Sequence, residues 1–214
     1  MPKAKTNKSA KPAIIFWFDP ASTYSYLSAM RVDEVAAASG VTVDWRPFLL
    51  GPVFKAQGMD TSPFNLFPLK GRYMWRDMQR QCARLSIPFA MPDEAALLDF
   101  PRNSLLAARA ATVALAEPWG RDFVRAVYAL EFAGSRDIAD PQVVAVAVEM
   151  AGGNPNSILK KATEDPVKAE LRANTEKAYE LGLFGAPSFT VGEEIFWGND
   201  RLEQAVEFAR EKVS

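Results

Sequence analysis

Histidine is absent from this sequence of 214 residues, and cysteine occurs once, as Cys82. The lack of histidine excludes Ser-His-Asp and Cys-His catalysis, histidine-ligated zinc and an imidazole general base. A single cysteine excludes an internal disulfide, a Cys-x-x-Cys redox pair and a metal site with several cysteines. Cys82 lies in a helical pattern, so we expect its side chain to pack in the core rather than to act as a nucleophile.

The sequence also lacks a strong net charge and long apolar runs. Lys and Arg number 25 against 26 for Asp and Glu, so the formal charge is −1, which favours neither nucleic acid nor an anionic membrane as partner. The apolar stretches are far shorter than the roughly 20 residues that span a bilayer. With 49% hydrophobic and 24% charged residues, we expect a soluble globular protein.

The first twelve residues differ in composition from the rest. Residues 1–12 carry lysines among small polar residues, and no apolar signal region follows them. This pattern predicts a disordered tail and a cytoplasmic protein. A nucleic-acid-binding arm is the alternative interpretation of the lysines.

Residues 13–46 predict a right-handed βαβ unit. The apolar run of residues 13–18 is bounded by prolines and indicates a buried central strand. Residues 22–40 combine a Ser/Thr-rich start, an apolar face and a final glycine, which predicts one capped helix. Residues 41–46 alternate, and the intervening helix makes this second strand parallel to the first.

The rest of the chain predicts a helical block followed by a hairpin. Residues 49–68 are rich in Pro, Gly and Phe and predict a long loop or short helices. Helical patterns then follow at residues 70–85, 104–117, 122–132, 141–150, 156–162 and 166–183. Residues 188–191 and 194–197 predict a hairpin, and Asp200 a cap for a last helix over residues 201–212.

This order of elements fits an α/β fold with one four-stranded mixed sheet and a large all-helical insertion. We expect residues 13–48 and 184–214 to form the sheet domain and residues 49–183 the helical insertion domain.

The first candidate site is Ser22-Thr23-Tyr24-Ser25, where the first strand meets its helix. A helix N-terminus presents free N–H groups that stabilise a thiolate, and a hydroxyl there donates one more hydrogen bond to the sulfur. The alternative is that Ser22 or Thr23 only caps the helix.

Two further candidates lie near the C-terminus. In Gly185-Ala186-Pro187-Ser188, a cis-proline would expose the backbone N–H and C=O of Ala186 to a peptide-like ligand, whereas a trans-proline would make a plain turn. In Trp197-Gly-Asn-Asp-Arg201, Asn199 and Asp200 could hold the ammonium and carboxylate of a ligand, or Asp200 could serve only as an N-cap.

Three segments together carry a family resemblance: Phe18-Asp-Pro-Ala-Ser22-Thr-Tyr-Ser25-Tyr-Leu27, Phe184-Gly-Ala-Pro187-Ser-Phe189 and Phe196-Trp-Gly-Asn-Asp-Arg-Leu202. They resemble the 2-hydroxychromene-2-carboxylate isomerases, relatives of kappa-class glutathione transferases in the DsbA-like thioredoxin superfamily. The Lys70-Gly-Arg-Tyr-Met74 segment also fits, and the resemblance covers about residues 13–212. It implies a thioredoxin-like fold, glutathione as cofactor and a homodimer.

The resemblance also implies roles for individual residues. Ser22, which stands where thioredoxins have the attacking cysteine, would hydrogen-bond the glutathione sulfur and hold it as thiolate. Pro187 would be the cis-proline, with Ala186 pairing the cysteinyl unit. The other implied glutathione contacts are Asn199 and Asp200 at the γ-glutamyl end, Lys70 at a carboxylate, and either Asp60 or Asn65 from the preceding loop.

If bound glutathione supplies the thiol nucleophile, the protein needs no catalytic histidine. Lowering a thiol pKa by two units takes about 2.7 kcal/mol. A hydrogen bond to a charged acceptor contributes roughly 1.5–3 kcal/mol and a helix terminus up to ~2 kcal/mol.

The implied reaction is isomerisation of a small aromatic carboxylate by addition and elimination of that thiolate. A kappa-like glutathione transferase and a non-catalytic glutathione-binding module are the alternatives. The candidates for the substrate side are three cations and four aromatic residues: Lys70, Arg72, Arg84, Phe64, Phe67, Tyr73 and Trp75.

Overall fold

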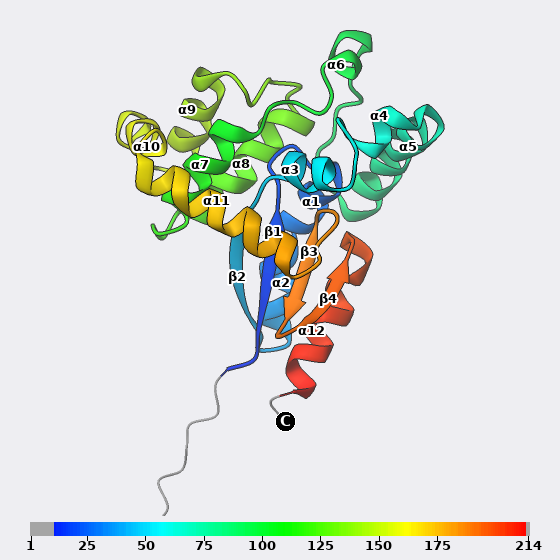
Figure 1. Ribbon diagram of the computed structural model, residues 1–214, viewed down its shortest axis with the longest axis vertical. Coiled ribbons are helices and arrows are strands. Elements are labelled where there is room, and N and C mark those ends of the chain that lie inside the picture. Colours follow the sequence, from blue (N-terminus) through cyan, green and yellow to red (C-terminus); the bar gives the residue numbers. More distant parts are fainter. Residues whose placement is uncertain (1–10, 213–214) are drawn as a thin grey trace, which may run out of the picture.

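The computed structural model describes residues 11–212 and has a mixed sheet at its centre (Figure 1). Within these residues the sheet has four strands, in the order β2-β1-β3-β4. Strand β1 (Ala13–Phe18) pairs in parallel with β2 (Thr42–Pro47). It pairs antiparallel with β3 (Ser188–Val191), which forms a hairpin with β4 (Glu194–Trp197). The predicted strands and the mixed four-stranded sheet are confirmed.

Alternation along β1 builds a hydrophobic core on each face of the sheet. Phe16 lies in the larger core, with residues of α2 (Val32–Ala38) and α12 (Leu202–Glu211). Trp17 points to the other face, where it packs in a smaller core with a residue of α11 (Asp165–Glu180). The uninterrupted apolar run of β1 therefore reflects burial on both faces.

The segment between β2 and β3 is helical, as predicted, and the described part of it contains no strand. Helices α7 (Leu105–Ala114), α8 (Gly120–Phe132) and α9 (Pro141–Met150) contribute to the same core as Phe16, so one hydrophobic core runs from the sheet into the helical block. No helix in residues 11–212 is long and apolar enough to cross a membrane. The other helices that precede α11 in this block are α3 (Leu50–Ala56), α4 (Pro63–Leu66), α5 (Pro68–Leu85), α6 (Glu94–Leu98) and α10 (Pro155–Ala162).

The predicted N-terminal tail, residues 1–12, lies outside the described residues except for its last two. The carbonyl of Pro12 accepts a hydrogen bond from the backbone N–H of Thr42 at 2.9 Å. Pairing with β2 therefore begins just ahead of β1.

Two predictions about helices are wrong. The single helix expected over residues 22–40 is broken at Arg31 into α1 (Thr23–Ala29) and α2. The side chain of Arg31 hydrogen-bonds Asn199 and pairs with Glu203, so contacts from a distant segment outweigh the local helical pattern. The final helix begins at Leu202 after a 3₁₀ turn, and no side chain caps it.

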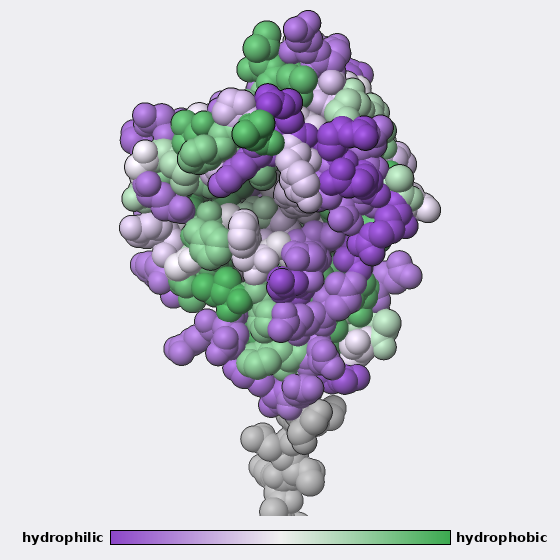
Figure 2. Space-filling view, turned by 90° about the vertical axis from the view of Figure 1, so that its right-hand side faces the viewer, coloured by the Kyte–Doolittle hydropathy of each residue, from purple (hydrophilic) through white to green (hydrophobic). Residues whose placement is uncertain are grey.

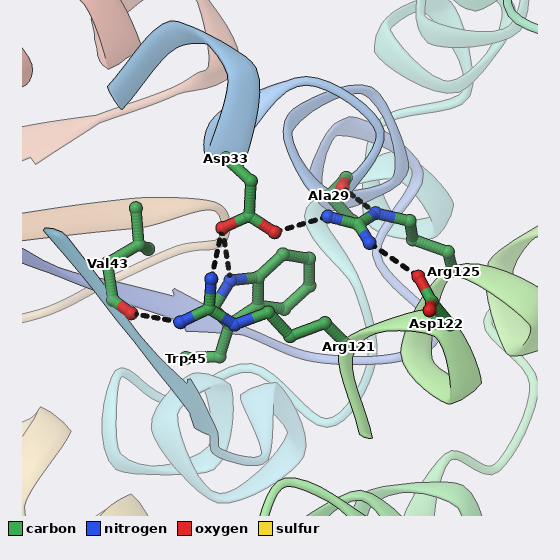
Figure 3. Close-up of polar contacts among 7 residues, drawn as sticks. All are labelled: Ala29, Asp33, Val43, Trp45, Arg121, Asp122 and Arg125. Atoms are coloured by element: carbon green, nitrogen blue, oxygen red, sulfur yellow. Dashed lines mark hydrogen bonds and ion pairs between the residues drawn. The ribbon is translucent and has the colours of Figure 1, made fainter. Parts of the chain in front are cut away.

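A polar cluster joins the sheet half of the molecule to the helical block (Figure 3). Asp33 of α2 accepts hydrogen bonds from the Trp45 indole at 3.2 Å and from Arg121 at 2.7 Å, and it also pairs with Arg125. Arg121 and Arg125, both on α8, donate in addition to backbone carbonyls of β2 and α1. Asp33 is thus the common acceptor for donors from β2 and α8.

We expect Asp33→Ala to lower the free energy of unfolding by about 1–3 kcal/mol, because three donors lose a partly buried charged acceptor. Chemical denaturation measures this loss. Asp44→Ala is the matched control, since Asp44 pairs with Arg46 at an exposed position of β2 and should cost less than about 1 kcal/mol. Equal losses in the two variants would show that the Asp33 cluster adds nothing beyond an exposed ion pair.

Candidate functional site

A cleft of about 1740 Å³ opens where β1 meets α1. Every glutathione-site residue proposed from the sequence lines it: Ser22, Asp60, Asn65, Lys70, Ala186, Pro187, Asn199 and Asp200. These residues come from segments more than 170 positions apart in the chain. The fold therefore gathers the three sequence motifs around one cavity.

Ser22 caps α1 and also faces the third segment of the chain. Its Oγ accepts the backbone N–H of Ser25 at 3.3 Å, as an N-cap does. The same hydroxyl donates to the carbonyl of Ala186 at 3.1 Å. Capping thus uses a lone pair of Ser22, while its proton points to the proline turn.

The peptide bond between Ala186 and Pro187 is cis, which confirms that alternative over a trans turn. The turn is tied to the end of the hairpin, because the Gly198 N–H donates to the Pro187 carbonyl at 2.9 Å. Beside it, the half-exposed rings of Phe184 and Trp197 meet edge to face at 4.8 Å. Gly185 lies against this indole so closely that a Cβ there would overlap Trp197 Nε1.

Asn199 and Asp200 stand at the same end of the cleft with different surroundings. The Oδ1 of buried Asn199 accepts from Ser28 at 3.1 Å and from Arg31 at 3.4 Å, which leaves its N–H groups for a ligand. Asp200 is exposed and pairs with Arg201 at 3.0 Å. Its predicted role as the cap of the last helix is wrong, because α12 begins beyond it without a side-chain cap.

Lys70 and both loop candidates line the cleft from α5 and from the segment that precedes it. The Lys70 ammonium lies 4.7 Å from the centre of the Phe67 ring. Asn65 donates through Nδ2 to Thr61 at 3.2 Å and to the Phe100 carbonyl at 2.6 Å. Both N–H groups of Asn65 are therefore engaged, whereas Asp60 lines the cleft as an exposed carboxylate.

The substrate-side candidates divide between the cleft and its surroundings. Lys70, Arg84, Phe64 and Tyr73 line the cleft. Arg72, Phe67 and Trp75 are not among its lining residues, and Trp75 packs on Phe89 and Phe100 instead.

Sequence reasoning missed Asp19, which is buried and lines the cleft beside Ser22. Its carboxylate accepts the N–H of Ala21 at 2.9 Å and that of Leu50 at 2.8 Å, and it also hydrogen-bonds Ser104. Burial raises the pKa of the Asp19 carboxyl, against these hydrogen bonds, which lower it. Through these hydrogen bonds, Asp19 connects the turn that carries Ser22 to the first residue of α3 and to the residue ahead of α7. The only signal was an Asp-Pro turn directly after the apolar run.

The single cysteine of the chain, Cys82, is buried in α5. Burial raises the pKa of its thiol to about 11. The prediction that the Cys82 side chain packs in the core is confirmed. Within residues 11–212, no group of three or more Cys, Asp or Glu side chains is placed to hold a metal ion.

The fold and this cleft, in which a cis-proline lies beside the start of the first helix, define a thioredoxin-class protein. The chain belongs to the family of DsbA-like thioredoxin domains, whose family model matches residues 13–209.

Its relatives are enzymes. The chain is 29% identical over 192 residues to 2-hydroxychromene-2-carboxylate isomerase of Sphingobium xenophagum, covering 89% of this chain and 94% of that one. It is 29% identical over 206 residues to human glutathione S-transferase kappa 1, covering 92% and 90%. Among solved structures, a 2-hydroxychromene-2-carboxylate isomerase superposes with a TM-score of 0.78 at 25% identity, covering 94% of this chain and 95% of that one.

Proposed function

We propose that this protein is a glutathione-dependent isomerase of aryl-conjugated acids of the 2-hydroxychromene-2-carboxylate type. The observation that carries the proposal is the hydrogen bond from the Ser22 hydroxyl to the Ala186 carbonyl, inside a cleft large enough for a tripeptide and a second molecule. The isomerase relatives, which span almost the whole chain, support it.

Binding of glutathione exchanges this hydrogen bond for two others. Ser22 has one proton to donate, and the Ala186 carbonyl accepts it in this structure. When the cysteinyl N–H of glutathione pairs with the Ala186 carbonyl, in the manner of an added strand, the Ser22 hydroxyl is released. It then donates to the glutathione sulfur, and a donor to the charged form lowers the pKa of that thiol.

The hydroxyl carries most of this stabilisation. A hydrogen bond to a charged acceptor contributes roughly 1.5–3 kcal/mol, which corresponds to a fall of about one to two units in the thiol pKa. Helix α1 has only seven residues, so its dipole adds less than the longer helix expected from the sequence would.

The two ends of the cleft offer groups that match the ends of the tripeptide. Asn199 presents N–H donors and Asp200 a carboxylate, which suit the carboxylate and ammonium of a γ-glutamyl group. Lys70, which lines the cleft from α5, suits the glycyl carboxylate. The tripeptide thus lies with its sulfur at Ser22.

In the reaction, the hemiketal C–O bond of the substrate ring first breaks, and the proton of the hemiketal hydroxyl passes to the released oxygen, so that a phenol and a conjugated ketone result. The thiolate then adds to the β carbon of this conjugated ketone, and the electron pair moves to the carbonyl oxygen as an enolate. The former double bond is now single and rotates. The enolate then re-forms the double bond and expels the thiolate, so glutathione is returned and no oxidant or reductant is needed.

The test is a steady-state assay with glutathione far below the substrate concentration. We expect many turnovers per glutathione, with the glutathione concentration unchanged at the end. Consumption of glutathione mole for mole with substrate would instead identify a kappa-like transferase. Binding of glutathione without turnover and without an ultraviolet thiolate band would identify a non-catalytic module.

A further inference from the structure

The cleft is larger than glutathione and a two-ring substrate together require. Pockets of roughly 300–1,000 Å³ are usual for one drug-sized ligand, which is about the combined size of a tripeptide and a two-ring acid. The volume of this cleft is about 1740 Å³. Space for a further ring system therefore remains.

Part of the cleft lining is apolar and exposed. Leu69 and Leu98 line the cleft and yet keep 74% and 83% of their surface exposed, which is typical of the rim of a ligand groove. On the face that carries α4 and α5, Figure 2 shows hydrophobic side chains beside a hollow in the upper half of the molecule. Such a surface suits a larger aromatic group rather than a more polar one.

The wall next to Ser22 is built from α3 and α7. Asp19 bonds the N–H of Leu50 at the start of α3 and also Ser104, directly ahead of α7, so both helices begin beside the Ser22 turn. Leu50 and Leu105 line the cleft there. A substrate attached to a sulfur at Ser22 therefore has the starts of α3 and α7 as neighbours.

Gly51 is the position on α3 at which a side chain is missing. It lines the cleft, and a Cβ built on it meets no atom within 4 Å, so the space above it is open. Its φ lies outside the left-handed region, so the backbone does not require glycine there. In a helix, glycine is less favourable than other residues by up to about 1 kcal/mol, and here it keeps the cleft wide.

We propose that Gly51 sets the size limit of the substrate side, and that the preferred substrate is an aryl-conjugated acid with at least three fused rings. This inference rests on the proposed isomerase function and names the substrate class of the same cleft. The third ring lies over Gly51, between the starts of α3 and α7.

The experiment compares 2-hydroxychromene-2-carboxylate with its benzo-fused three-ring counterpart. For the wild-type chain we expect kcat/KM for the three-ring acid to equal or exceed that for the two-ring acid. Gly51→Phe should lower kcat/KM for the three-ring acid at least about tenfold, mainly through KM, and leave the two-ring acid within about threefold. Gly51→Leu should give a smaller loss in the same direction.

Ala56→Phe is the matched control, because Ala56 is exposed on the same helix and does not line the cleft. It should leave both substrates within about twofold. Turnover of the two-ring acid alone by the wild type, or an equal effect of Gly51→Phe on both acids, would overturn the inference and leave the isomerase function standing. Absence of glutathione-dependent turnover of either acid would overturn both.

Discussion

In the Ser22→Ala variant, the pKa of the bound glutathione thiol is expected to rise by about one to two units. The variant removes the hydroxyl that donates to the charged sulfur, and such a bond contributes roughly 1.5–3 kcal/mol. Because the thiolate is the reactive form, a higher pKa leaves less of it at neutral pH. The acid limb of the kcat/KM profile should therefore move to higher pH by the same amount, and the rate at pH 7 should fall about ten- to a hundredfold.

Titration of the ultraviolet thiolate band of the glutathione complex measures this shift directly. Ser62→Ala is the matched control, since Ser62 is also buried, lines the same cleft and caps a helix by accepting the Phe64 N–H at 3.3 Å. We expect Ser62→Ala to leave the thiol pKa unchanged. If the two variants behaved alike, Ser22 would be a helix cap and no more.

Ser22→Cys provides a covalent test of where the sulfur lies. If glutathione binds with its sulfur at position 22, the introduced thiolate attacks glutathione disulfide, forms a mixed disulfide and releases one glutathione thiolate. We expect nearly complete modification, with one glutathione per chain by intact mass, under conditions in which the wild type stays unmodified. The native background is small because Cys82 is buried, with a pKa raised to about 11.

Ser62→Cys is the corresponding control for the covalent test, as it places a thiol in the same cleft at a position that, unlike Ser22, makes no hydrogen bond to Ala186. Its modification should be at least about tenfold slower, since only well-positioned reactants gain from proximity. Equal rates at the two positions would contradict a bound tripeptide oriented by Ala186.

The sheet was predictable because its strands are marked by local patterns. The apolar run that forms β1 and the alternation that forms β2 each identify a strand from neighbouring residues alone. The break at Arg31 was not predictable, because it depends on Asn199 and Glu203, which follow about 170 residues later. Helix α6 was also missed, and it has only five residues.

The site was predictable only where its residues belong to motifs. Ser22 and Pro187 stand in segments whose spacing carries chemical meaning, and the structure places them on one cleft. Asp19 was missed because its partners, Leu50 and Ser104, come from helices that no local pattern connects to β1. Whether the Asn65 side-chain N–H groups are free to bind a ligand likewise depends on the Phe100 carbonyl, 35 residues away in the sequence.

Because Gly185 lies in contact with the Trp197 indole, we expect the residues at positions 185 and 197 to covary among homologues. Since a side chain at position 185 would occupy part of the volume of that ring, a homologue with alanine or a larger residue there needs a displaced indole or a smaller residue at position 197. Such a paired replacement would reshape the rim of the cleft beside the cis-proline.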